Sequence, residues 1–226
     1  MSTNFMELFQ AGGLAMYPLL LFSVIIWIIG IQKVIELSIF VKNYLNFYKE
    51  LDSVLMSKNS EEVKWALKNS SKYLNNSYMR LFDEIVTSKK LSMSDAKESL
   101  TRRLSETQGS LKKRLWIVGT IGSTTPFVGL CGTVIGIMTS FKSIGESGKS
   151  GFGVVSAGIS EALVATAAGI LIAVAALIVY NYLQNKVNVV FVDFKNKVED
   201  MVLKMKMCRQ DSQESDEMPP RFIPAE

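Results

Sequence analysis

Hydrophobic residues gather in three long blocks along this chain, and polar and charged residues fill the segments between them. The blocks cover residues 14–32, 115–141 and 154–183. About 20 apolar residues, each rising about 1.5 Å along a helix, are enough to cross the hydrocarbon core of a bilayer. The pattern therefore predicts an all-α integral membrane protein with three transmembrane helices.

Lys and Arg are unevenly distributed among the segments that separate these blocks. Residues 1–13 contain none and the connection 142–153 contains two, whereas residues 33–114 hold sixteen of the twenty-five. Because basic residues accumulate in cytoplasmic loops, the chain is predicted to have its N-terminus outside and its C-terminus inside. Acidic residues are interleaved with the basic ones, so the net charge of +4 does not indicate a nucleic-acid partner.

Apolar residues also recur every three or four positions outside the blocks, which predicts long helices that extend into a cytoplasmic helical domain. The stripe from Ala96 to Leu115 contains no proline, so we expect one unbroken helix that continues into the second span. The expected organisation is an external amphipathic segment (1–13), a first span (14–32), the cytoplasmic domain (33–114), a second span (115–141), an external loop (142–153), a third span (154–183), a cytoplasmic helix (184–208) and a disordered tail (209–226).

The second and third blocks differ from simple membrane anchors in their many small and hydroxyl-bearing residues. Pro126 lacks the N–H that would bond to Gly122, so it should kink the second helix, and nearby hydroxyls can satisfy the freed carbonyl. Small residues let helix backbones approach closely in lipid. We expect these faces to pack between subunits, because three spans offer them no partner within one chain. The candidate packing positions are Gly132, Gly136, Gly158 and Gly169.

Glu161 is the only Asp, Glu, Lys or Arg within the three blocks. A charge at membrane depth costs about 3 kcal/mol, so such a residue usually faces a cavity or a partner on an ion path. Glu161, Thr133 and Thr166 are expected about 10, 12 and 18 Å below the outer surface, where they could form one polar layer. Hydroxyls donate and accept hydrogen bonds and can pass protons. One ionisable group is too few for a complete path, so another chain must supply a second.

The sequence offers little for catalysis or cofactor binding. It contains no His, and its two cysteines, Cys131 and Cys208, belong to no CxxC or Cys/His cluster. No stretch has the glycine spacing of a phosphate-binding loop. We therefore expect no enzymatic activity, no metal site and no cofactor.

The stretches TPFVGLCGTVIGIMTSF (125–141) and GISEALVATAAGILIAVAALIVYN (158–181) closely resemble the paired signatures of the ExbB/TolQ/MotA proton-channel family. The resemblance implies a homopentameric ring in the bacterial inner membrane. The ring would enclose the membrane helices of an ExbD/TolR-like single-span dimer and act, with a TonB/TolA-like protein, on the outer membrane. It also implies that Glu161, Thr166 and Thr133 belong to the proton pathway.

Several functions remain open within and outside this family. The flagellar MotA branch has a further span and a larger cytoplasmic domain, for which this chain has no room. An ExbB-like role in outer-membrane transport, a TolQ-like role in outer-membrane integrity and division, and a gliding-type motor remain. A membrane scaffold, in which Glu161 only bonds to a neighbouring group, is a different reading. So is a self-sufficient channel, which the single acidic group and the lack of an inverted repeat disfavour.

Overall fold

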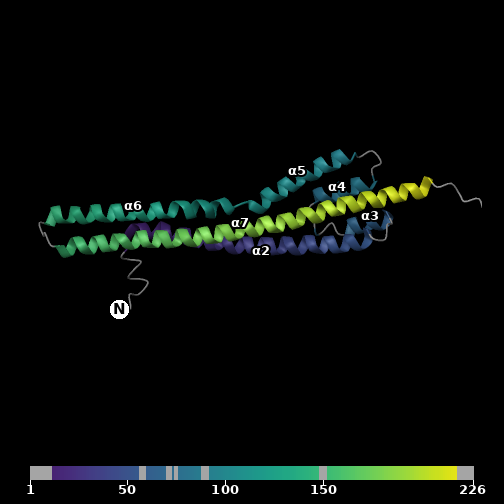
Figure 1. Ribbon diagram of the computed structural model, residues 1–226. Helices are drawn as coiled ribbons and strands as arrows, with labels where there is room; N and C mark the ends of the chain where they lie inside the picture. Colours follow the sequence, from purple (N-terminus) through teal and green to yellow (C-terminus); the bar gives the residue numbers. More distant parts are fainter. Residues whose placement is uncertain are drawn as a thin grey trace, which may run out of the picture. The chain divides into compact units, whose positions relative to one another are not determined.

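The structure, a computed structural model, describes residues 12–55, 60–69, 73, 76–87, 92–147 and 152–217. Its regular elements are all helices (Figure 1). They are η1 (Gly13–Ala15), α2 (Met16–Leu55), α3 (Ser60–Asn69), α4 (Asn76–Thr87), α5 (Met93–Lys112), α6 (Leu115–Ser147) and α7 (Phe152–Glu217). Three of them, α2, α6 and α7, contain a stretch that is long and apolar enough to cross a membrane. The all-helical class and the three predicted spans are confirmed. Of the expected external segment, residues 1–11 lie outside the described residues.

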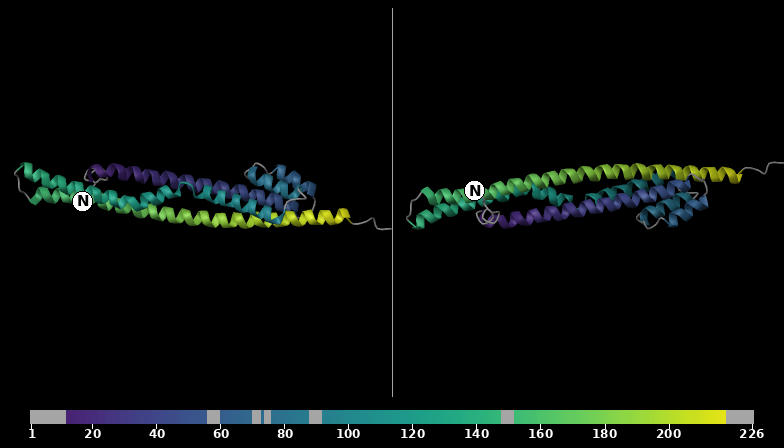
Figure 2. Two further views of the ribbon diagram at one scale, coloured as in Figure 1. Left: turned by 90° about the horizontal axis from the view of Figure 1, so that it is seen from above. Right: turned by 90° about the horizontal axis from the view of Figure 1, so that it is seen from below.

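The chain divides into two compact units. Residues 1–35 and 112–186 form the first unit, and residues 36–111 and 187–226 form the second. In the first unit α2, α6 and α7 lie side by side (Figure 2) around a core of Ile26, Ile29, Val118, Ile121 and Ala176. Only 22%, 17% and 28% of the apolar windows of these three helices is buried. Most of their hydrophobic surface is therefore left for lipid or for other chains.

The second unit has an aromatic and aliphatic core built from helices far apart in the sequence. Phe47 of α2 stacks on Phe82 of α4 with ring centroids 5.8 Å apart, and Phe194 of α7 is also fully buried. The apolar stripes expected between residues 33 and 114 supply much of this core, and α7 adds Phe194. The cytoplasmic location of this unit stays a prediction.

The helix expected to run unbroken from Ala96 into the second span is interrupted, and that prediction is wrong. Helix α5 ends at Lys112, α6 begins at Leu115, and Arg114 between them has a φ of 71°. A left-handed residue ends the helical hydrogen-bond ladder, and Lys112 in the last turn of α5 suits the negative end of its dipole. The apolar stripe does not reveal the break, because Leu111 and Leu115 keep the four-residue spacing across it.

Two other helices are longer than their expected segments. Helix α6 continues to Ser147, into the expected external loop. Helix α7 is continuous from Phe152 to Glu217, so the first half of the tail expected to be disordered, residues 209–217, is helical. The stretch contains neither Gly nor Pro before Pro219, and extending an existing helix needs no new nucleus. Residues 218–226 lie outside the described residues.

Candidate functional site

The candidate site lies in the first unit, where α6 and α7 approach each other most closely. A Cβ atom added at Gly129 of α6 would come within 2.9 Å of the Ala165 carbonyl oxygen and 3.0 Å of the Thr166 Cα atom. A Cβ atom added at Gly169 of α7 would lie 3.0 Å from the Thr125 carbonyl oxygen. These distances are shorter than ordinary contacts to backbone atoms, so only glycine at these two positions lets the helices pack this closely.

The glycines expected to pack between subunits instead face neighbours within the same chain. A Cβ atom at Gly132 would meet Ala15 at 2.6 Å and Ala165 at 3.1 Å, and one at Gly136 would meet Ala162 at 2.7 Å. Gly158 faces Ser140 in the same way. The expectation that these small faces lack partners within one chain is therefore wrong. These small residues instead allow α6 and α7 of the same chain to pack closely against each other.

This close packing brings together two of the three predicted pathway residues. The Thr166 hydroxyl of α7 donates a hydrogen bond to the Thr133 hydroxyl of α6, with 3.4 Å between the oxygens. Thr133 is 7% exposed, and its own hydroxyl hydrogen goes to the Leu130 carbonyl at 2.7 Å. The hydroxyl pair therefore has a fixed donor direction, and lone pairs of the Thr166 oxygen remain able to accept a bond.

Glu161, the third predicted residue, does not join this pair within one chain. It lies on α7 five positions before Thr166, which places it about 140° further around the helix. Its side chain is exposed on the surface of the first unit, whereas Thr166 is half-buried. A single chain therefore holds a part-buried hydroxyl pair and a separate, outward-facing carboxylate.

Pro126 lies inside α6, and three hydroxyl side chains precede it. Ser123 and Thr124 donate to the Thr120 carbonyl, and the buried Thr125 donates to the Ile121 carbonyl. The expected acceptor was the Gly122 carbonyl, which loses its backbone partner because Pro126 has no N–H. The observed bonds go instead to the carbonyls one and two positions before it. The hydroxyls reinforce the turn in front of the proline, and the helix continues through it to Ser147.

Gly129 is the site residue that the sequence-based reasoning missed. Its signal is its spacing: Gly129 precedes Thr133 by four positions and therefore lies on the same face of α6. Gly122 and Gly136, seven positions to either side, also face α7. A seven-residue glycine repeat aligned with a polar residue marks the contact face more directly than the pair Gly132 and Gly136.

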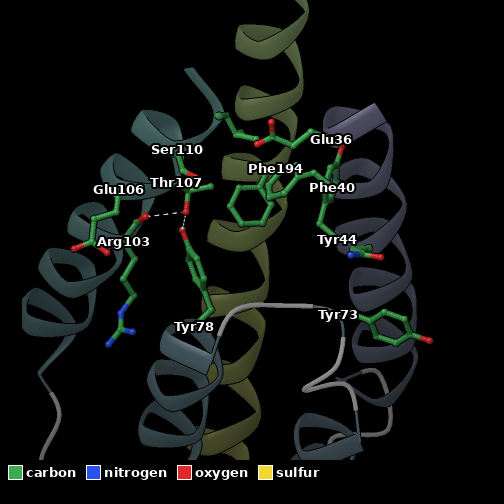
Figure 3. Close-up of a pocket in the computed structure, with 12 residues that line it drawn as sticks. Glu36, Phe40, Tyr44, Tyr73, Tyr78, Arg103, Glu106, Thr107, Ser110 and Phe194 are labelled. Carbon is green, nitrogen blue, oxygen red and sulfur yellow. Dashed lines mark hydrogen bonds between the residues drawn. The ribbon is translucent and has the colours of Figure 1, made fainter. Parts of the chain in front are cut away.

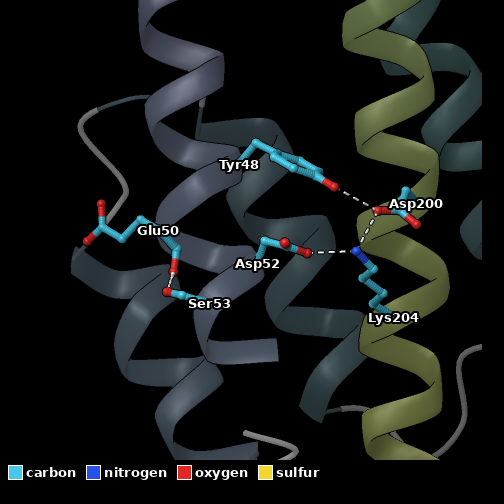
Figure 4. Close-up of polar contacts among 6 residues, drawn as sticks. All are labelled: Tyr48, Glu50, Asp52, Ser53, Asp200 and Lys204. Carbon is cyan, nitrogen blue, oxygen red and sulfur yellow. Dashed lines mark hydrogen bonds and ion pairs between the residues drawn. The ribbon is translucent and has the colours of Figure 1, made fainter. Parts of the chain in front are cut away.

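A second polar cluster, in the second unit, was also missed. Lys204 of α7 lies 2.6 Å from Asp52 of α2 and 2.8 Å from Asp200 on its own helix, and the Tyr48 hydroxyl donates to Asp200 at 3.1 Å (Figure 4). The two carboxylates raise the pKa of Lys204. This cluster links α2 to α7 beyond the apolar blocks. The pair Asp200–Lys204 was its signal in the sequence, since residues four apart share a helix face.

Among the described residues, no group of three or more His, Cys, Asp or Glu side chains could hold a metal ion. In the first unit, the hydroxyl pair and the separate Glu161 carboxylate lie on helices that are long and apolar enough to cross a membrane.

The comparisons with known proteins identify the family. The model of the MotA/TolQ/ExbB proton channel family matches residues 57–196, which is more than half of the chain. The chain belongs to this family. Its resemblance to the family, predicted from the two motifs, is confirmed.

Individual relatives carry two different names. The biopolymer transport protein ExbB of Aquifex aeolicus is 37% identical over 105 residues, which cover 46% of this chain and 71% of the relative. ExbB of Pseudomonas putida is 52% identical over 65 residues, 29% of this chain and 20% of the relative. The Tol-Pal system protein TolQ of Haemophilus influenzae is 37% identical over 91 residues, 40% of each chain. The matched regions of the last two relatives are well under two thirds of their lengths.

Proposed function

We propose that this chain is the ring subunit of a proton-driven motor in the bacterial inner membrane. In this role it binds an ExbD/TolR-like partner and uses the proton motive force to energise transport across the outer membrane. Family membership supports the channel class, and the 71% coverage of an ExbB relative favours the transport role. The observation that carries the proposal is the hydroxyl pair of Thr133 and Thr166, held between two membrane-crossing helices.

The topology and the assembly belong to the same proposal. The N-terminus faces the outside and the C-terminus the cytoplasm, in line with the distribution of Lys and Arg. Five copies form a ring, and the exposed apolar faces of α2, α6 and α7 contact lipid and neighbouring copies. The outward-facing Glu161 then meets a neighbouring subunit or the partner, which supplies the second protonatable group that this chain lacks.

A TolQ-type role in outer-membrane integrity is the second candidate, favoured by the match to TolQ of Haemophilus influenzae. The two roles differ in the partner that must complete the proton path. A gliding-type motor would need yet another partner. A membrane scaffold without an ion path would need none.

Proton uptake into liposomes tests these alternatives. The chain is reconstituted alone, with an ExbD-like partner, and with a TolR-like partner, and internal acidification is followed under an imposed membrane potential. We expect uptake only when a partner is present, and the partner that supports it assigns the role. Uptake by the chain alone would indicate a self-sufficient channel. No uptake with either partner, despite a stable complex, would contradict the proposed function.

A further inference from the structure

The second unit contains a cavity of about 290 Å³ that the proposed motor function does not use (Figure 3). Every residue that lines it belongs to that unit, with helices α2, α4, α5 and α7 contributing side chains. The volume is close to the lower end of the range for small-molecule sites, which begins at about 300 Å³. The cavity is therefore large enough for one flat organic molecule.

Aromatic rings form the inner wall of this cavity. Phe194 makes edge-to-face contacts with three other rings: Phe40 at 5.1 Å, Tyr44 at 5.5 Å and Tyr78 at 5.7 Å between centroids. Phe194, Tyr44 and Tyr78 are buried, so the wall is rigid and already formed. Aromatic faces carry partial negative charge, which attracts cations and the positive edges of other rings.

Three hydroxyl groups at this wall, those of Tyr44, Tyr78 and Thr107, have already used their hydrogens. Thr107 donates to the Arg103 carbonyl at 3.0 Å, and a hydroxyl has only one hydrogen. Tyr78 must therefore be the donor in its 2.7 Å bond with Thr107. Tyr44 donates to Asp193 at 2.6 Å. To a bound molecule these tyrosine oxygens can offer only lone pairs.

The charged residues at the cavity also favour a positively charged ligand. Glu36, Glu106 and Arg103 are the charged residues of the lining. Figure 3 shows the Glu36 carboxylate reaching over Phe194, whereas the charged groups of Arg103 and Glu106 both point away from the rings. The aromatic rings, the hydroxyl oxygens whose hydrogens are already donated, and the Glu36 carboxylate together present negative potential and hydrogen-bond acceptors.

We propose that this cavity is a binding site for a small organic cation, an ammonium carried on a flat apolar body. The apolar body lies against the rings of Phe40, Tyr44 and Phe194. The ammonium group donates to the Glu36 carboxylate and to the oxygen of Tyr78. The site stands in the cytoplasmic unit, so it is independent of proton passage through the first unit, and either proposal can fail without the other.

Isothermal titration calorimetry on the full chain in nanodiscs tests the site, with empty nanodiscs as the reference. The probe is 2-phenylethylammonium, and its matched anion and neutral analogue are phenylacetate and 2-phenylethanol. We expect one saturable site per chain for the cation and binding about tenfold weaker, or weaker still, for the two analogues. Equal or tighter binding of phenylacetate would overturn the proposal, as would the absence of saturable cation binding.

Matched variants locate the binding within the cavity. Glu36→Gln removes the charge from an exposed side chain at little risk to folding, and should weaken cation binding about tenfold. Glu98→Gln, at an exposed position of α5 outside the cavity, should leave it unchanged. Ser110→Phe places a ring in the cavity and should abolish binding, with circular dichroism confirming the helix content. Unchanged binding in Glu36→Gln or in Ser110→Phe would contradict the assignment.

Discussion

The hydroxyl oxygens of Thr133 and Thr166 lie 3.4 Å apart, although 33 positions separate the two residues in the chain. Their bond has a direction: Thr166 donates to Thr133, and Thr133 donates to the Leu130 carbonyl. The pair is thus a short polar connection between two apolar helices, anchored at one end on the backbone. At the other end, the Thr166 oxygen keeps lone pairs that can accept a hydrogen bond.

Removing these hydroxyls should reduce proton uptake without preventing assembly. Thr133→Val and Thr166→Val keep the branched shape and delete only the oxygen, so the packing of α6 on α7 should survive. We expect uptake by the reconstituted complex to fall by about a hundredfold, the lower end of the range for loss of one proton-transfer group. Thr→Ser at either position retains the hydroxyl and serves as the control. Full activity in both Val variants would assign the pair to packing alone.

Glu161 should be needed for proton movement and not for folding. Its side chain is exposed on α7, so neither Glu161→Gln nor Glu161→Ala should disturb the packing of the first unit. Both changes should abolish uptake while the complex still forms, because neither side chain can exchange a proton at neutral pH. Size-exclusion chromatography reports assembly and the liposome assay reports uptake. An active Gln variant would place Glu161 outside the proton path.

The purified protein should be oligomeric. The three spans leave large apolar side chains exposed, among them Phe127, Met138 and Leu171, which are 70%, 66% and 71% exposed. Native mass spectrometry from mild detergent should show a ring, with five copies as the family resemblance implies. A monomer that supports proton uptake with the partner present would contradict this assembly.

Two glycine substitutions on α6 should have opposite effects on thermal stability. Gly129→Ala adds a methyl group 2.9 Å from the Ala165 carbonyl oxygen and should cost about 1–3 kcal/mol, because two backbones must separate. Gly145→Ala adds the same methyl group where no atom lies within 4 Å. The higher helix propensity of Ala should there stabilise by about 1 kcal/mol. Melting followed by circular dichroism compares the pair. Equal shifts would disprove a tight contact at Gly129.

Tyr78 should make the second unit sensitive to alkaline pH. Burial raises the pKa of its phenol to about 12 from an ordinary value of 10.0. The protonated form is favoured in the folded state, so this stabilisation is complete below pH 10 and is lost as the pH rises through about 12. Burial and Asp193 also raise the pKa of Tyr44, so absorbance at about 295 nm should show more than one tyrosine that ionises late, and Tyr78→Phe should remove the share of one residue. An unchanged amplitude of the late phase in the variant would show that Tyr78 does not contribute to it.

The sequence by itself determined the class of the protein and the identity of its main candidate residues. Three apolar blocks of about 20 residues or more indicate membrane-spanning segments, and these must be helical here because every backbone polar group in lipid must be satisfied within the segment. A lone carboxylate in such a block, Glu161, is costly enough to indicate a role. Counting residues along two helices also placed Thr133 and Thr166 about 12 and 18 Å below the outer surface, within one expected polar layer.

The tertiary structure decided how these helices meet. Depth says nothing about rotation, so only the packing of α6 on α7 could show that Thr133 contacts Thr166 while Glu161 points elsewhere. The stripe of small residues was visible in the sequence, but not whether its partner was the same chain or another. The break at Arg114 depended on one residue adopting a left-handed conformation, which neither composition nor periodicity encodes. The long-range bonds of Lys204 and Tyr78 likewise arise only when distant helices are brought together.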